Sequence, residues 1–190
     1  SSWRRWRVSR HPAGASSHRR LNAVTKSDHY PLPLIDELLQ STKRGCYMST
    51  LDLRSGYWQV RVNEQDRDKT AFISPLGTYR FKRMPFGLKN APATFQLLID
   101  RLRSCSSLAN VTLLAYLDDL LIISEGFQQH LQDLQAVFNR LREFKSRVNR
   151  EKCVFARELV KYLGHVITQQ GVSPDSDKVQ TSSRFRNERT

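Results

Sequence analysis

The stretch from Val111 to Ile123 reads VTLLAYLDDLLII and joins two apolar runs through the adjacent aspartates Asp118 and Asp119. Short apolar runs of this kind predict buried strands, here the two strands of a hairpin. Burying an ionised carboxylate without a partner costs on the order of several kcal/mol, so the pair favours a site where cations hold the carboxylates. The alternative is an ordinary exposed turn, because Asp is a common turn residue.

A further carboxylate lies upstream, at the end of another predicted strand. Residues 46–53, CYMSTLDL, predict a strand in which Asp52 stands between Leu51 and Leu53. If adjacent strands bring Asp52 close to the aspartate pair, the carboxylates repel one another, and without a nearby Lys or Arg they do not all stay ionised at neutral pH. Divalent cations resolve this conflict, and Mg²⁺ prefers such hard oxygen ligands.

A pair of Mg²⁺ ions about 4 Å apart can activate an attacking hydroxyl and stabilise the leaving oxygen of a phosphoryl displacement. The carboxylates therefore predict metal-assisted phosphoryl or nucleotidyl transfer. Nucleases and polymerases use the same parts, and the residues alone leave both classes open.

The composition favours nucleic acid as the partner. Lys and Arg outnumber Asp and Glu by 31 to 18 in the 190 residues, which gives a net charge of +13, while 39% of the residues are hydrophobic. A foldable chain with this imbalance typically binds a polyanion, although a basic protein that is merely soluble stays an alternative. The three cysteines are far apart without CxxC spacing, which fits a reducing, intracellular setting. No apolar run approaches the roughly 20 residues of a transmembrane helix, so no membrane partner is expected.

The remaining patterns predict an α+β fold, an antiparallel sheet with helices packed on one face. Apolar spacing predicts a helix around residues 34–39, a helix capped by Asn90, and a long helix over 127–148. The apolar stripe of the long helix is expected to be core; it consists of Phe127, Leu131, Leu134, Phe138 and Leu141. Further strands are predicted at residues 59–62, 70–74 and 78–84, with a closing pair at 152–155 and 160–168.

Four ordered boxes resemble the reverse transcriptases of gypsy-type LTR retrotransposons. Residues 116–119, YLDD, in their apolar hairpin look like the catalytic YxDD box of these enzymes. Residues 51–60, LDLRSGYWQV, and 83–96, RMPFGLKNAPATFQ, are similar to the two preceding boxes, and residues 162–172 also match. The resemblance covers residues 20–179. It implies a palm with partial fingers, as in right-hand polymerases, and RNA-directed DNA polymerase activity.

The resemblance also implies roles for the carboxylates. Asp52 and Asp118 would hold the two Mg²⁺ ions, with Mn²⁺ as a substitute, and Asp119 would assist the ion that lowers the pKa of the primer 3′-hydroxyl. That hydroxyl would attack the α-phosphate of a dNTP, on a template of RNA or DNA.

Further positions acquire roles in the same way. Tyr57 would stand under the sugar of the incoming nucleotide and reject a 2′-hydroxyl, and Phe86 and Gly87 would line the same pocket. Leu163 and Gly164 would fall in the hairpin that grips the primer end. The alternative for Tyr57 and Phe86 is plain core packing.

The ends of the chain depart from the family pattern. We expect an irregular basic segment at residues 1–18, the palm with partial fingers at 19–179, and an irregular tail at 180–190. Residues 1–18 lack the finger strands that bind the triphosphate, and no thumb or ribonuclease H pattern is found, so we expect a fragment with out-of-frame ends.

The alternative function is therefore a catalytically inactive retroelement relic that binds nucleic acid by charge. The resemblance implies an intracellular protein of the cytoplasmic retroelement particle, with access to the nucleus and no secretion. The sequence leaves the oligomeric state open.

Overall fold

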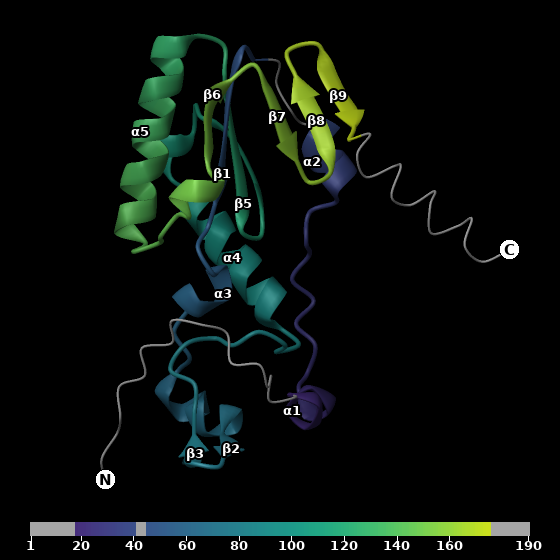
Figure 1. Ribbon diagram of the computed structural model, residues 1–190, viewed down its shortest axis with the longest axis vertical. Coiled ribbons are helices and arrows are strands. Elements are labelled where there is room, and N and C mark those ends of the chain that lie inside the picture. The colour runs from purple at the N-terminus through teal and green to yellow at the C-terminus, as the bar shows by residue number, and fades with distance from the viewer. Residues whose placement is uncertain (1–17, 41–44, 176–190) are drawn as a thin grey trace, which may run out of the picture.

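The computed structural model describes residues 18–40 and 45–175, and its centre is a four-stranded antiparallel sheet (Figure 1). The strand order is β4-β5-β1-β6, so that strands distant in sequence pair directly. These strands are β4 (Thr112–Tyr116), β5 (Asp119–Ser124), β1 (Tyr47–Asp52) and β6 (Val154–Arg157). The strands predicted from the apolar runs at 111–123 and from residues 46–53 are confirmed.

Helices and smaller sheets surround this centre. The α-helices are α1 (Arg19–Val24), α2 (Ile35–Gln40), α3 (Gly56–Gln59), α4 (Ala91–Arg103) and α5 (Phe127–Glu143). Short 3₁₀ helices are η1 (Glu64–Thr70), η2 (Ser106–Leu108) and η3 (Arg150–Lys152). A hairpin consists of β2 (Phe72–Ser74) and β3 (Gly77–Tyr79), and a three-stranded sheet of β7 (Leu159–Tyr162), β8 (His165–Thr168) and β9 (Gly171–Pro174). The hairpin and the three-stranded sheet lie at opposite ends of the molecule (Figure 1).

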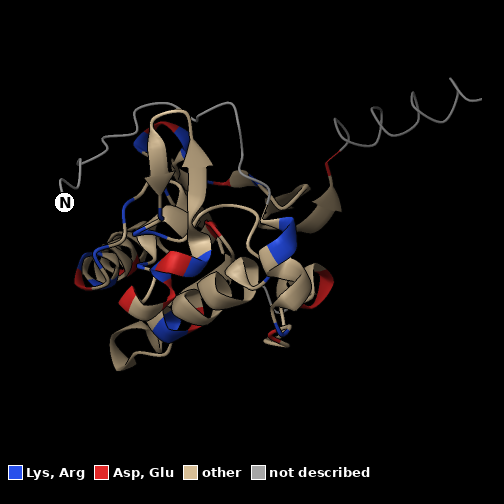
Figure 2. Cartoon of the chain, turned by 90° about the horizontal axis from the view of Figure 1, so that it is seen from below, with Lys and Arg blue, Asp and Glu red and all other residues tan. Residues whose placement is uncertain are grey.

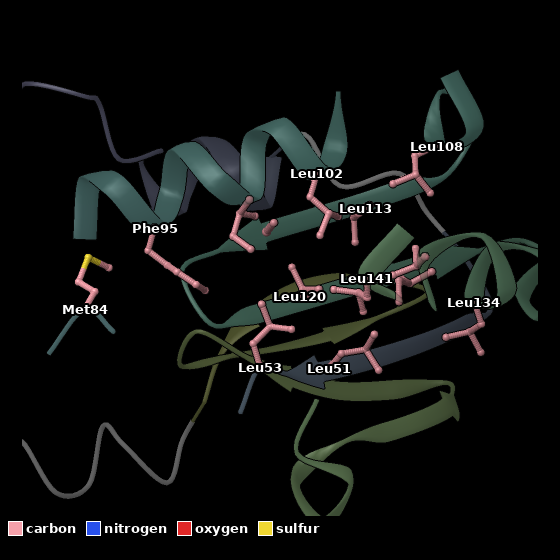
Figure 3. Packing of buried hydrophobic residues seen from close by; sticks show 14 of the residues in the cluster. Leu51, Leu53, Met84, Phe95, Leu102, Leu108, Leu113, Leu120, Leu134 and Leu141 are labelled. Carbon is pink, nitrogen blue, oxygen red and sulfur yellow. The ribbon is translucent and has the colours of Figure 1, made fainter. Parts of the chain in front are cut away.

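Apolar residues cover both faces of the central sheet. Along β5, Leu120 and Ile122 join the cluster under α4 and α5, whereas Leu121 and Ile123 join a cluster with α2 and the β7–β9 sheet. In Figure 3, Phe95 and Leu102 of α4 point toward the sheet. Because each face has its own cover, β5 is continuously apolar rather than alternating, as in other strands buried on both faces. The expected α+β architecture is confirmed, with α4 and α5 sharing one face.

A buried chain of polar side chains fastens α5 to the sheet. The Nδ1 and Nε2 atoms of His130 lie 2.9 Å from Ser124 Oγ and 2.7 Å from Ser49 Oγ. The hydroxyl of Ser124 donates to Asp133 Oδ2 at 2.6 Å, so it accepts from the Nδ1–H of His130. The Nε2 atom is then the acceptor for Ser49, whose oxygen accepts the Ala156 N–H at 3.0 Å. This arrangement satisfies a neutral imidazole, and burial lowers the pKa of His130 accordingly.

The predicted strand at residues 59–62 is wrong. Residues 56–59 form the one-turn helix α3, in which the Trp58 N–H donates to the Ser55 carbonyl, and the Val60 N–H donates to the Tyr57 carbonyl. Beyond this turn, the pairing is reduced to a single bridge between Arg61 and Arg83. The local turn thus takes the Val60 donor, and among the described residues only two backbone hydrogen bonds, Val62 N–H to Lys82 and Met84 N–H to Val60, flank that bridge.

The long helix α5 ends at Glu143, five residues before the predicted end. Lys145 adopts a left-handed φ of 54°, and the Ser146 N–H donates to the Leu141 carbonyl at 2.8 Å. This pattern is a Schellman-type helix end. The predicted core stripe is also partly wrong, because Phe127 and Leu131 are 49% and 44% exposed. The buried face instead consists of His130, Asp133, Leu134, Val137 and Leu141.

Asn90 occupies the N-cap position of α4, but its side chain makes no capping hydrogen bond. Its Oδ1 accepts the Asp28 N–H at 3.0 Å, and its Nδ2 donates to the Lys26 carbonyl at 2.9 Å. The predicted capping role is therefore wrong. The side chain instead holds the segment before α2 against the start of α4.

The other strand boundaries also differ from the prediction. Residues 152–155 and 160–168 do not pair with each other: β6 joins β1, and residues 159–168 form the β7–β8 hairpin. The β2–β3 hairpin is shorter than predicted and ends at Tyr79. The irregular segments predicted at 1–18 and 180–190 lie outside the described residues, except for residue 18. Among residues 18–40 and 45–175, no helix is long and apolar enough to cross a membrane.

Candidate active site

The pairing of β1 with β5 brings the carboxylates together. Asp52 and Asp119 are direct partners in the antiparallel register, and Tyr116 pairs with Asp119 across the β4–β5 hairpin. Asp118 is therefore the second residue of a two-residue loop, after Leu117. The Asp118 carbonyl accepts the Leu53 N–H at 2.8 Å, which ties the loop to the end of β1.

Asp52 and Asp119 line a cleft of about 260 Å³ between the central sheet and the β7–β8 hairpin. Lys152 lies in the same cleft, with its Nζ 3.3 Å from Asp52 Oδ2. A lysine therefore does lie near the carboxylates, which partly relieves the repulsion between them. No sequence pattern indicated this neighbour, because Lys152 lies 100 residues from Asp52 and is the last residue of η3.

The carboxylate of Asp118 lies on the other side of the loop, against α3. Its Oδ1 is buried and has no hydrogen-bond partner among the described residues. A Cβ at Gly56 would lie 1.7 Å from this oxygen and 2.7 Å from the ring of Phe95, so no larger residue fits there. Gly56 is thus part of the site; it lies in the box at residues 51–60, but the sequence indicated no role for it.

Burial and the neighbouring charges oppose ionisation of Asp118 and Asp119. Burial, followed by the charges of Asp119 and Asp52, raises the pKa of Asp118 to about 6, while Lys152 opposes the rise. Burial and the charge of Asp52 likewise raise the pKa of Asp119. The predicted repulsion therefore exists in this arrangement, and a cation would relieve it.

The residues fit divalent cations in their chemistry, since they offer hard carboxylate oxygens and one buried oxygen without a partner. Their side chains do not yet form a complete coordination site. Within residues 18–40 and 45–175, no group of three His, Cys, Asp or Glu side chains could hold a metal ion in the conformation described. Asp118 faces α3 while Asp52 and Asp119 face the cleft, so the carboxylates are neighbours whose side chains still have to converge.

Tyr57 and Phe86 lie on the Asp118 side of the loop. The ring of Tyr57 is 5.2 Å from that of Phe86 and 5.7 Å from that of Phe95, measured between centroids. Burial and the charge of Asp118 raise the pKa of Tyr57. Phe86 is 47% exposed, so it is not a plain core residue. Gly87 follows with a φ of 86°, a conformation that favours glycine.

Leu163 and Gly164 form the turn between β7 and β8, with φ values of 50° and 79°. Leu163 lines the cleft that contains Asp52 and Asp119. The neighbouring Tyr162 donates its hydroxyl to the Asp119 carbonyl at 3.2 Å. The structure therefore brings this turn close to the carboxylates. Tyr162 links the turn to the backbone of Asp119, a role that the sequence did not indicate.

Comparison with known proteins agrees with this arrangement. The profile of the family described as reverse transcriptase (RNA-dependent DNA polymerase) matches residues 6–167. The chain is 39% identical over 163 residues to the retrovirus-related Pol polyprotein from transposon 297 of Drosophila melanogaster, covering 86% of this chain and 15% of that protein. It is 36% identical over 167 residues to the corresponding polyprotein from the Drosophila melanogaster transposon gypsy, covering 88% of this chain and 16% of that protein.

A solved structure resembles the whole arrangement. The foamy viral protease-reverse transcriptase in complex with an RNA/DNA hybrid superposes with a TM-score of 0.77 at 28% identity, covering 86% of this chain and 22% of that chain. The present chain thus spans about one sixth of the length of the two polyproteins. The family match and the paired aspartates together establish that the chain belongs to the reverse transcriptase family, with relatives among the gypsy-type LTR elements.

Proposed function

We propose that residues 19–179 are the palm and partial fingers of an RNA-directed DNA polymerase that adds dNTPs to a primer 3′-hydroxyl. The observation that carries this proposal is the register of β1 and β5, in which Asp52 pairs with Asp119 beside the buried, unpartnered Oδ1 of Asp118. Carboxylates that lie this close together repel one another, and cations bound between them would offset that repulsion.

Asp52, Asp118 and Asp119 would hold two Mg²⁺ ions, with Mn²⁺ as a substitute. If bound there, the ions would lower the pKa of the attacking hydroxyl and stabilise the negative charge of the leaving pyrophosphate. The chain contributes the placement of the ligands: the β1–β5 ladder fixes two of them, and the loop bonded to Leu53 fixes the third. When no cation is present, the ammonium of Lys152 forms an ion pair with the Asp52 carboxylate.

The Asp118 side of the loop is the proposed nucleotide pocket. Tyr57 contacts Phe86 close to Asp118, and its ring would exclude the 2′-hydroxyl of a ribonucleotide by its volume. The exposed ring of Phe86 and the backbone of Gly87 would line the same pocket. Leu163 and Gly164, on the cleft side, would contact the primer end.

The proposed partners are a primer with an RNA or DNA template, and the proposed setting is intracellular. The foamy viral relative was solved with an RNA/DNA hybrid, which supports a nucleic-acid partner here. Lys and Arg occur on several elements of the described chain (Figure 2). The ranges 1–17, 41–44 and 176–190 contain ten Lys or Arg and two Asp or Glu, so they carry +8 of the net charge of +13. Much of the electrostatic attraction would therefore come from these ranges.

One observation favours the second candidate function, an inactive relic that binds nucleic acid by charge. In the described residues, the carboxylates do not form a ready metal cage. Binding by charge alone would weaken steeply with salt and would be indifferent to Mg²⁺ and dNTPs.

The test is primer extension on a poly(rA) template with an oligo(dT) primer, in Mg²⁺ and in Mn²⁺. The chain is compared with Asp118→Asn and with Asp36→Asn, an exposed carboxylate in the first turn of α2 that controls for the same chemical change. We expect extension by the unchanged chain and by Asp36→Asn, and none by Asp118→Asn. Equal extension by all three proteins would reject the site, whereas salt-sensitive binding without any extension would support the relic.

A further inference from the structure

A chain of hydrogen bonds links the segment before α2 to the loop that carries Asp118. The Tyr30 hydroxyl donates to Asp100 Oδ2 at 2.7 Å, and Gln96 Nε2 donates to Asp100 Oδ1 at 3.2 Å. The Leu117 N–H then donates to Gln96 Oε1 at 3.0 Å. Tyr30 lies in the extended stretch between α1 and α2, whereas Gln96 and Asp100 lie on α4.

The middle of this chain has a fixed direction. Gln96 is fully buried at 0% exposure, and its two amide ends face opposite kinds of partner. The Leu117 N–H requires an acceptor and the Asp100 carboxylate requires a donor, so the reversed amide would leave both unsatisfied. Gln96 and Asp100 are four residues apart on one helix, the spacing at which side chains meet. The Asp100 carboxylate therefore selects the orientation in which Gln96 holds Leu117.

Leu117, whose N–H Gln96 accepts, has an unfavourable backbone conformation. Leu117 has a φ of 49°, a left-handed conformation that is unfavourable for a leucine. The hydrogen bond from its N–H to Gln96 stabilises this conformation. Leu117 directly precedes Asp118, whose Oδ1 is enclosed by Gly56, so a relaxed Leu117 would displace the Asp118 carboxylate.

The other end of the chain is anchored as well. Asn90 bonds to the backbone of Lys26 and Asp28, and the Asp28 carboxylate accepts the Tyr30 N–H at 3.1 Å. The segment that contains Tyr30 is thus bonded to the start of α4 and, through Asp100, to its middle. Hydrogen bonds thus run without a break from this segment to Leu117 in the loop.

We propose that Tyr30, Asp100 and Gln96 form a positioning relay that holds Leu117 in its left-handed conformation and so sets the Asp118 carboxylate for cation binding. None of the three touches the cation ligands directly, so they are positioning residues rather than catalytic ones. Through Tyr30, the segment before α2 then helps to position the Asp118 carboxylate. The cation-binding part of this inference rests on the proposed function.

The test measures two quantities on the full chain. Amide hydrogen exchange of Leu117, followed by NMR without any cation, reports the relay itself, and Mn²⁺ affinity reports its consequence. The variants are Gln96→Leu, which removes both amide ends, and Tyr30→Phe, which removes one hydroxyl. Tyr79→Phe is the matched control, because it also removes a hydroxyl that donates a hydrogen bond, to Leu76 in the distant β2–β3 hairpin.

In Gln96→Leu, Leu117 should exchange about fivefold faster or more, the loss expected for one hydrogen bond, while the β1–β5 amides keep their protection. Tyr30→Phe should give a smaller acceleration, and no further one in the Gln96→Leu background, because the relay is then already broken. Both variants should weaken Mn²⁺ binding, and Tyr79→Phe should change neither quantity.

Unchanged exchange of Leu117 in Gln96→Leu, with the β1–β5 amides still protected, would overturn the relay. Equal effects of Tyr30→Phe in both backgrounds would overturn the role of Tyr30. If the unchanged chain fails to bind Mn²⁺ while the exchange results are as expected, the proposed function fails and the relay stands as a structural device.

Discussion

Asp118→Asn is expected to raise the free energy of unfolding of the cation-free protein at about pH 8. The buried Oδ1 of Asp118 has no hydrogen-bond partner among the described residues, and the charges of Asp52 and Asp119 act on the carboxylate. Asparagine keeps the size of the side chain and removes its charge. The variant therefore loses both the desolvation cost and the repulsion.

The magnitude follows from the pKa of Asp118, which burial and the neighbouring carboxylates raise from 3.8 to about 6. Because the folded state binds this proton more tightly, the favourable contribution is complete below pH 3.8 and is lost as the pH rises through about 6. The difference corresponds to roughly 3 kcal/mol. Since Asp118 is only partly buried, solvent screening reduces the expected gain to about 2 kcal/mol.

The assay is urea unfolding followed by circular dichroism, in EDTA, at about pH 8 and at about pH 3.5. The variant should be more stable at the higher pH and equal to the unchanged chain at the lower pH, where both side chains are neutral. Asp36→Asn is the control and should lose about 0.5 kcal/mol, because its charge favours the N-terminus of α2. No gain at pH 8, or a gain that persists at pH 3.5, would refute the reasoning.

The other perturbations address the neighbours of the carboxylates and the buried imidazole. Gly56→Ala places a Cβ 1.7 Å from Asp118 Oδ1; it should cost about 2 kcal/mol in urea unfolding and weaken Mn²⁺ binding measured by electron paramagnetic resonance. Lys152→Met removes the ammonium 3.3 Å from Asp52 Oδ2. This change should strengthen Mn²⁺ binding roughly two- to fivefold in calorimetry, the small factor expected for an exposed ion pair. Weaker binding would show that Lys152 does not compete with the cation. Burial lowers the pKa of His130 below 6.5, so the unfolded state takes up this proton first and stability should fall as the pH drops below 6.5. His130→Leu should lose about 2 kcal/mol at pH 7.5 and less at pH 5.5 by the same unfolding assay, and an equal loss at both pH values would argue against a neutral imidazole.

Local pattern alone predicted the elements that lie closest to the site. The apolar runs around Asp118, the strand that ends at Asp52 and the helix after Asn90 all form where the sequence placed them. Each is specified by a short-range signal, such as apolar content, a turn residue or helical spacing, which a single segment carries by itself. The expectation that adjacent strands bring carboxylates together is met by Asp52 and Asp119, which are direct partners in one sheet, whereas the Asp118 carboxylate faces α3.

The errors occur where a local pattern competes with a distant partner. Residues 59–62 alternate like a strand, but α3 includes Gln59, and the Val60 N–H donates to Tyr57 in the same turn. Asparagine is a common helix-capping residue, yet the side chain of Asn90 makes its hydrogen bonds with the backbone of residues 26–28 instead. The apolar stripe of α5 continues to Phe127, but that ring packs edge-to-face with Tyr47, at the start of β1, and remains 49% exposed.

The sequence by itself identified the carboxylates that we propose as cation ligands, because hard oxygen ligands are recognisable by type and because the boxes at residues 51–60 and 116–119 are specific. Only the tertiary structure decided how those ligands are set: Asp52 beside Lys152 in the cleft, and Asp118 against Gly56 with one oxygen unpartnered. Burial, repulsion and side-chain direction depend on neighbours 60 to 100 residues away. No short-range pattern carries that information, because it arises when the sheet closes.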